Sequence, residues 1–175
     1  MAAYIYASLL GGNILFIDLS VLMWLGQVNL LVTQGYYWQL LTSMFIHVHL
    51  PHLIFNLIFL LVYGSRAEET LGEAAYLFTY ISAGLVGNIS TLIFMGFDTV
   101  AVSAGASGAI FGIIGAYMTY LGARYDATIK PYLIYCLLLL TLNISVNVNL
   151  LAHIGGLASG SIMGYLKARG RKIEP

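Results

Sequence analysis

The sequence predicts an all-α membrane protein whose helices cross the bilayer as a polytopic bundle. Of its 175 residues, 60% are hydrophobic and only 8% are charged, and the mean hydropathy is +0.89. A soluble domain carries about a quarter charged residues, so most of this chain must contact lipid or its own helices. The charged residues lie between apolar runs rather than within them, as expected of helices that span a membrane.

Composition also argues against several other classes of protein. The formal net charge is zero, and no basic field indicates a nucleic-acid partner. The single cysteine, Cys136, lies in an apolar run and cannot form an internal disulfide. No basic stretch precedes the first apolar residues, so a cleavable signal peptide does not fit.

Five apolar runs come close to the length of about 20 residues that crosses a hydrocarbon core. They are Leu50–Tyr63, Ala74–Met95, Ser107–Leu121, Pro131–Val146 and Leu150–Leu166. Two of them contain small residues at four-residue spacing, Gly108-x3-Gly112 and Gly156-x3-Gly160. This spacing lets two helix backbones approach closely, so both are expected to be packing surfaces.

The residues before these runs follow a different pattern. Tyr4–Leu10 is apolar but too short to span, and is interpreted as the end of a first helix whose beginning is absent. Ile14–Val32 is long enough but contains Asp18, and an unpaired Asp near a helix centre costs about 2.5–3.5 kcal/mol. Ile14–Gln39 is therefore predicted to lie in the membrane interface, with a true span over Ile14–Val32 as the alternative. Aromatic residues would hold it there: Trp24, Tyr36, Tyr37 and Trp38.

The basic residues predict the orientation of the helices. If the spans alternate, all seven Lys and Arg residues fall on one side, which the positive-inside rule makes cytoplasmic. The connections around Phe97–Thr99 and Asn147–Asn149 are then external, as is the chain before Pro51. We expect one membrane domain over residues 1–175: a remnant of the first helix (1–10), an external interfacial loop (11–49), five spanning helices (50–168) and a cytoplasmic tail (169–175).

Four polar residues are predicted to lie in the outer third of three different helices. Pro51 suits a first helical turn, so His52 and Asn56 share one helix face, with Asn56 about 8 Å below the outer end. The run from Ser107 to Leu121 covers only about 21 Å, so Ser107 should start a helix about 10 Å below the surface of a core roughly 30 Å thick. His153 follows the last external loop.

This combination of residues indicates nucleophilic catalysis. A serine hydroxyl needs a base to take its proton as it attacks a carbonyl, and an imidazole can return that proton to the leaving amine. The Asn56 amide, the His52 ring and the Ser107 backbone N–H could stabilise the oxyanion. No acidic residue lies within the apolar runs, so a Ser107–His153 dyad is simpler than a triad.

Each residue also has a structural interpretation. A serine among small residues more often serves helix packing, and Ser107 taken alone would be catalytic in roughly one case in ten. His153 could be an interfacial histidine, and His52 and Asn56 could be structural hydrogen-bonding residues. His47 and His49 are the weakest candidates and are expected to face the interface. No Cys or acidic residue joins the histidines at ligand spacing, so no metal is expected.

At these residues the sequence resembles the rhomboid family of intramembrane serine proteases. The matching motifs are His47-x4-His52-x3-Asn56, Gly105-Ala-Ser107-Gly108 and Ala152-His153-x-Gly155-Gly156, supported by Tyr37–Phe45 and Gly64-x3-Glu68. GxSG alone would be weak, but the three motifs in this order are specific.

The resemblance implies a six-helix fold, here with a shortened first helix, and a water-filled cavity open to the outside. Ser107 would be the nucleophile, His153 the general base, and His52 and Asn56 the oxyanion residues. Pro131–Val146 would gate lateral access of the substrate, Asn147–Asn149 would lie in the cap, and Ile14–Gln39 would be the membrane-embedded first loop.

Two side chains depart from the pattern of the family. Gln39 replaces a common Arg, with an expected effect on the stability of the loop rather than on chemistry. Phe111 replaces a common Tyr that packs on the catalytic histidine, and it keeps the stacking face but lacks the hydroxyl.

The predicted function is that of a serine endopeptidase cutting in or near transmembrane segments of membrane proteins, without a cofactor. Its partners would be transmembrane substrates and the lipid bilayer. It would be a multi-pass protein of a prokaryotic cell membrane, with a cytoplasmic C-terminus and a site open to the external side. A rhomboid-like protein that binds without cutting should lack Ser107 or His153, and both are present. A transporter should carry ionisable residues along a path through the membrane, whereas this polar cluster stops in the outer third.

Overall fold

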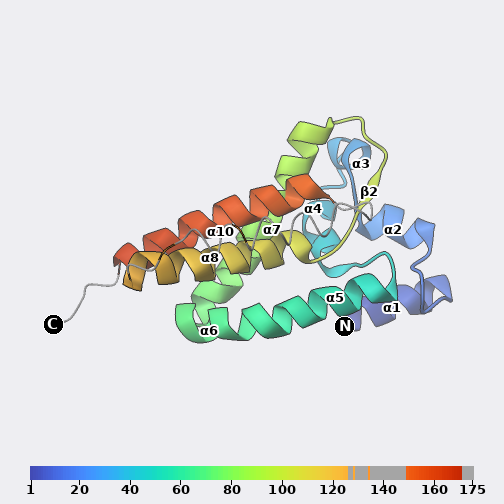
Figure 1. The fold of residues 1–175 in the computed structure, drawn as a ribbon. Coiled ribbons are helices and arrows are strands. Elements are labelled where there is room, and N and C mark those ends of the chain that lie inside the picture. Colours follow the sequence, from blue (N-terminus) through green and yellow to red (C-terminus); the bar gives the residue numbers. More distant parts are fainter. Residues whose placement is uncertain (126–127, 129–133, 135–148, 171–175) are drawn as a thin grey trace.

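The computed structural model describes residues 1–125, 128, 134 and 149–170, which are largely helical (Figure 1). The N-terminal elements are short: α1 (Ala2–Gly11), α2 (Leu19–Leu25), β1 (Gln27–Val28), α3 (Asn29–Thr33), α4 (Gln39–Thr42) and η1 (Ser43–Phe45). The bundle follows: α5 (Leu50–Phe59), η2 (Leu60–Gly64), α6 (Ser65–Leu71), α7 (Glu73–Met95), β2 (Val102–Ser103), α8 (Ser107–Tyr125) and α10 (Leu150–Gly170). The predicted span Pro131–Val146 lies outside the described residues.

The first long helix begins at Leu50, directly after His49. His49 is its N-cap, because its Nδ1 accepts the backbone N–H of His52 at 3.0 Å, and Pro51 occupies the first turn. The helix continues from α5 through a π-turn into α6, and Gly72, at a φ of +83° that favours glycine, separates it from α7. Within the described residues, Leu50–Leu71 and Glu73–Met95 are the two helices whose length and hydropathy suit a membrane span.

Helices α8 and α10 lie side by side along their length (Figure 1). Glycines of α10 face the backbone of α8 so closely that a Cβ added at Gly160 would lie 1.9 Å from the carbonyl oxygen of Gly112. The same relation joins Gly156 to Gly108 and Gly164 to Ala116. The two small-residue motifs predicted as packing surfaces therefore form one shared interface. Helix α8 also runs to Tyr125, four residues beyond the expected end at Leu121.

The segment Ile14–Gln39 folds as short helices and a strand. Asp18 caps α2, since its carboxylate accepts the backbone N–H of Ser20 at 2.8 Å, and the bonds from the Ser20 hydroxyl and backbone hold the pKa of Asp18 below its usual value. Gly26 ends α2 before β1 begins. A continuous span over Ile14–Val32, the alternative considered above, therefore does not hold.

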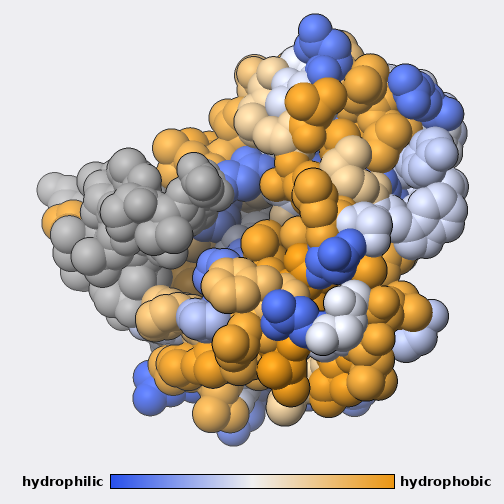
Figure 2. All heavy atoms as spheres, turned by 90° about the vertical axis from the view of Figure 1, so that its right-hand side faces the viewer, coloured by the Kyte–Doolittle hydropathy of each residue, from blue (hydrophilic) through white to orange (hydrophobic). Residues whose placement is uncertain are grey.

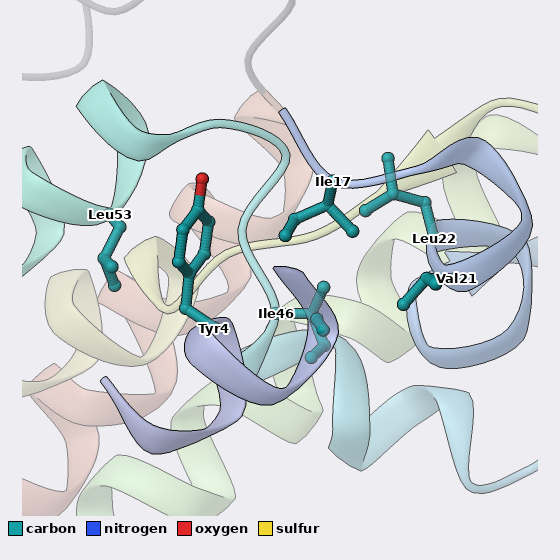
Figure 3. Packing of buried hydrophobic residues seen from close by; sticks show 7 residues of the cluster. Tyr4, Ile17, Val21, Leu22, Ile46 and Leu53 are labelled. Carbon is teal, nitrogen blue, oxygen red and sulfur yellow. The ribbon is translucent and has the colours of Figure 1, made fainter. Parts of the chain in front are cut away.

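Helix α1 packs against this segment and against the start of α5. Figure 3 shows Tyr4 of α1 beside Leu53 of α5 and Ile46, within one cluster of buried side chains that also includes Ile17. The Tyr4 hydroxyl donates a hydrogen bond to the Ile14 carbonyl at 3.0 Å. The N-terminal elements are thus joined to the bundle by a shared hydrophobic cluster.

Aromatic rings predicted to anchor the segment lie together and near the surface. The ring centroids of Trp24 and Trp38 are 5.0 Å apart, and those of Tyr36 and Trp38 are 4.8 Å apart. Trp24 is 54% exposed and Tyr37 is 68% exposed. Such an exposed aromatic group fits the level of the lipid headgroups.

Buried amides fasten the same segment to α7. The Gln39 side chain accepts the Val28 N–H at 2.9 Å and donates to the Met23 carbonyl at 2.7 Å. The Asn88 amide of α7 donates to the Leu40 carbonyl at 2.7 Å. Because Gln39 has no exposed surface, these bonds satisfy backbone groups that would otherwise be buried without partners.

Candidate active site

Ser107 is the first residue of α8 and follows a loop held by the N-terminal segment. Strands β1 and β2 pair antiparallel, with Gln27 opposite Ser103. Two residues before Ser107, Gly105 donates its N–H to the Ser43 carbonyl at 2.9 Å. Gly105 has a φ of +136°, and a Cβ there would lie 2.7 Å from the His52 ring. Only glycine meets both conditions, which explains its place in the motif.

His153 lies opposite, in the first turn of α10. Its Nε2 atom is 2.7 Å from the Ser107 Oγ, and the ring is only 1% exposed. A neutral imidazole with an unprotonated Nε2 can accept the serine proton along this contact. The structure thus brings together the two residues predicted to form a dyad, at hydrogen-bonding distance.

Phe111 packs against the face of the histidine ring. One turn after Ser107, its ring stacks on His153 with centroids 4.5 Å apart and an interplanar angle of 23°. This is the contact that the sequence predicted for a phenylalanine at this position. The other ring nitrogen, Nδ1 of His153, is buried and has no hydrogen-bond partner in the described part of the chain.

His52 and Asn56 lie on α5, on the side of the Ser107 loop. The His52 ring lies against Gly105. Asn56 is buried, and its Nδ2 donates to the His52 carbonyl at 2.8 Å. An amide nitrogen carries two hydrogens, so this bond within the helix leaves one for a substrate oxygen.

The expectation that His47 faces the membrane interface is wrong. His47 is 4% exposed, and its Nε2 accepts the N–H of Ala106 at 3.4 Å, directly before Ser107. Its ring centroid is 5.2 Å from that of His52. Burial lowers the pKa of His47 to about 3, with a further contribution from His52, so the ring is neutral. His49 has a different role, as the cap of α5.

The sequence made His47 a weak candidate because this residue precedes the first spanning helix, and only residues within a helix have a depth in the membrane that the sequence predicts. The loop between η1 and α5 contacts the loop that precedes Ser107, and this tertiary contact buries the His47 ring. The signal that could have identified it was the spacing His47-x4-His52, since both rings contact the loop before Ser107.

Figure 2 looks onto the end of the molecule at which Figure 1 shows α1 and α2, and largely hydrophobic surface covers this end, with scattered hydrophilic residues. Among the described residues, no group of three His, Cys, Asp or Glu side chains could hold a metal ion.

Comparison with known proteins agrees with this geometry. Residues 34–170 match the Rhomboid domain. The chain is 34% identical over 157 residues to YdcA of Bacillus subtilis (strain 168), which carries a provisional rhomboid-protease name, covering 84% of this chain and 77% of YdcA. It is 32% identical over 137 residues to rhomboid protease GluP of the same organism, covering 75% of this chain but 26% of GluP. Rhomboid-like protease 3 of Toxoplasma gondii is 31% identical over 131 residues, or 70% of this chain and 49% of that protein. The chain therefore belongs to the rhomboid family of intramembrane serine proteases.

Proposed function

We propose that this chain is an active intramembrane endopeptidase that cuts peptide bonds in or near transmembrane segments through a Ser107–His153 dyad. The observation that carries the proposal is the 2.7 Å contact between His153 Nε2 and Ser107 Oγ at the start of α8. Ser107 also has the free backbone N–H of a helix start. A rhomboid-like protein that only binds its partners would not need this contact.

Peptide hydrolysis would proceed in two steps. As the Ser107 Oγ attacks the scissile carbonyl carbon, its proton passes to His153 Nε2 and a tetrahedral oxyanion forms. The imidazolium then gives the proton to the leaving amine, and the C–N bond breaks to leave an acyl-enzyme. A water molecule next loses a proton to His153 and attacks the ester, which releases the carboxylic acid product and restores Ser107.

The oxyanion requires donors that are in place before the reaction. The backbone N–H of Ser107, the Asn56 amide and the His52 ring are proposed for this role. Asn56 and His52 are one turn apart on α5, and His52 already contacts the Ser107 loop at Gly105. The second hydrogen of the Asn56 amide would point to the substrate.

The substrate is proposed to be a transmembrane segment of another membrane protein. A helix in lipid hides its carbonyl groups in backbone hydrogen bonds, so residues that weaken the helix should favour cleavage. The positions of the basic residues favour a cytoplasmic C-terminus and a site that opens on the external side of the membrane.

Covalent labelling by a fluorescent fluorophosphonate, which reacts with activated serines, tests the proposal. The purified full chain in detergent should be labelled and should cut a model transmembrane substrate. Ser107→Ala should lose both signals, and His153→Ala should lower both by about 10²–10⁴-fold, the usual contribution of a general base.

Ser65→Ala is the matched control for the serine substitution. Within the described residues its hydroxyl bonds only to the Leu61 carbonyl, one turn earlier in the same continuous helix, so labelling and cleavage should stay at the wild-type level. Labelling that persists in Ser107→Ala would overturn the assignment of the nucleophile.

A further inference from the structure

We propose that Asn149 is a positioning residue that holds the start of α10, and hence His153, against the strand that leads to Ser107. The inference rests on the proposed dyad and adds a residue outside the three sequence motifs. Asn149 directly precedes α10 and lies four positions before His153. It is half-buried between α7 and β2.

The side chain of Asn149 bonds to three separate elements. Its Nδ2 donates to the Thr91 Oγ1 of α7 at 2.8 Å and to the Ser103 Oγ of β2 at 2.7 Å. Its Oδ1 accepts the N–H of Ala152 at 3.1 Å, which caps the first turn of α10. Both hydrogens of the amide nitrogen and one lone pair of the oxygen are thus used in different directions.

The bonds of Asn149 reach the element that carries each member of the proposed dyad. The carbonyl of Asn149 accepts the backbone N–H of His153 at 3.3 Å, so the position of Asn149 sets that of the histidine. Ser103 lies four residues before Ser107, on the strand that leads into the nucleophile loop. One amide therefore ties the base to the nucleophile without contacting either reacting atom.

The chemistry at Thr91 requires an amide and not a carboxylate. Thr91 donates its single hydroxyl hydrogen to the Gly87 carbonyl at 3.1 Å, so toward Asn149 it can only accept. An aspartate at position 149 would still cap the helix, and Asp is among the best N-cap residues. It would, however, place two acceptors face to face at Thr91, whereas the Ser103 hydroxyl could rotate and donate to the carboxylate. The bond to α7 would therefore be the one that is lost.

This difference separates a positioning role from simple capping. If Asn149 only caps α10, Asn149→Asp should match the wild type and Asn149→Ala should be impaired. If Asn149 positions His153 through its donated bonds, both substitutions should be impaired. Small displacements of a catalytic group can cost about 100-fold in rate, so the effect should be measurable.

The test measures kcat and KM for cleavage of a transmembrane model substrate by the purified full chain, together with the melting temperature. Asn149→Ala and Asn149→Asp should each lower kcat by about 10–100-fold, with KM within about twofold of wild type, because substrate binding is untouched. Thr91→Val and Ser103→Ala should each reproduce part of the loss. Asn13→Ala, which removes a capping side chain in an exposed N-terminal turn, should leave kcat unchanged.

A double variant shows whether Asn149 acts through the histidine. In a His153→Ala background, Asn149→Ala should cause no further loss in the residual rate, because residues that act as a unit are not additive. A further loss as large as in the wild-type background would contradict the proposal. A wild-type kcat in the Asn149→Asp variant would show that Asn149 serves only as the N-terminal cap of α10.

If the Asn149 variants do not fold, Thr91→Val and Ser103→Ala decide: wild-type kcat in both would overturn the inference, and lowered kcat in both with KM unchanged would support it. Failure here is distinct from failure of the dyad. Full activity in the Ser107→Ala variant would contradict the proposed function itself. If Ser107→Ala loses activity while every Asn149, Thr91 and Ser103 variant keeps full activity, only the positioning role of Asn149 is contradicted.

Discussion

His153 Nε2 and Ser107 Oγ lie 2.7 Å apart although 46 positions separate the two residues in the chain. Each stands in the first turn of its own helix. The distance between them is therefore set by how closely α8 and α10 approach, and that approach depends on glycines whose added Cβ atoms would strike the facing backbone. The distance between Ser107 and His153 therefore depends on the packing of α8 against α10.

Gly160→Ala should destabilise the fold and lower activity together. A Cβ at this position would lie 1.9 Å from the Gly112 carbonyl oxygen, so the helices must separate, and overpacking of this kind typically costs about 1–3 kcal/mol. Thermal unfolding in detergent, followed by cleavage of a model substrate, measures both effects. Gly170→Ala is the control, because no atom of the described residues lies within 4 Å of a Cβ there. Equal melting temperatures for the two variants would contradict the close packing.

Phe111→Leu should slow cleavage while leaving most of the stability. Leucine keeps an apolar side chain at this buried position but loses the stack on His153, which has a centroid distance of 4.5 Å. Aromatic pairs contribute about 0.5–1.5 kcal/mol beyond buried area, which corresponds to a fall in kcat of roughly 2–13-fold. Phe111→Tyr keeps the stack and should stay near the wild-type rate. A leucine variant that cleaves as fast as the tyrosine variant would show that the ring does not orient His153.

Asn56→Ala should lower kcat with little change in KM. If the second hydrogen of the amide binds the oxyanion, its loss weakens only the transition state, by up to about 10²–10³-fold as for an oxyanion donor in soluble enzymes. The bond to the His52 carbonyl is also lost, so the melting temperature must be recorded for the same variant. A higher KM at constant kcat would instead place Asn56 in the binding of the substrate's ground state.

The sequence was enough to place Ser107 and His153 at a similar depth, because depth in a membrane bundle follows from topology. In the structure Ser107 is the first residue of α8, and His153 lies in the first turn of α10. The stacking of Phe111 on His153 was implied by the resemblance to the rhomboid family, and the structure has this contact. His47 and Asn149 were not predicted as parts of the site, because their partners come from loops and from other helices. Contacts of that kind depend on the tertiary fold and leave no periodic pattern in the sequence.

Gln39 is one of the two residues at which the sequence was expected to depart from the family pattern, and hydrogen bonds to the backbone surround its side chain. The side chain has no exposed surface, accepts the Val28 N–H and donates to the Met23 carbonyl. Gln39→Ala leaves both backbone groups without these partners, at a cost of about 1–3 kcal/mol for each group. The melting temperature should therefore fall, while kcat for the folded fraction should change little, since Gln39 contacts the first loop and not the dyad. Gln34→Ala is a matched control, because Gln34 lies in the same segment and is exposed, and exposed substitutions usually change stability by less than about 0.5 kcal/mol. Equal melting temperatures for the two alanine variants would show that the buried amide does not hold the loop.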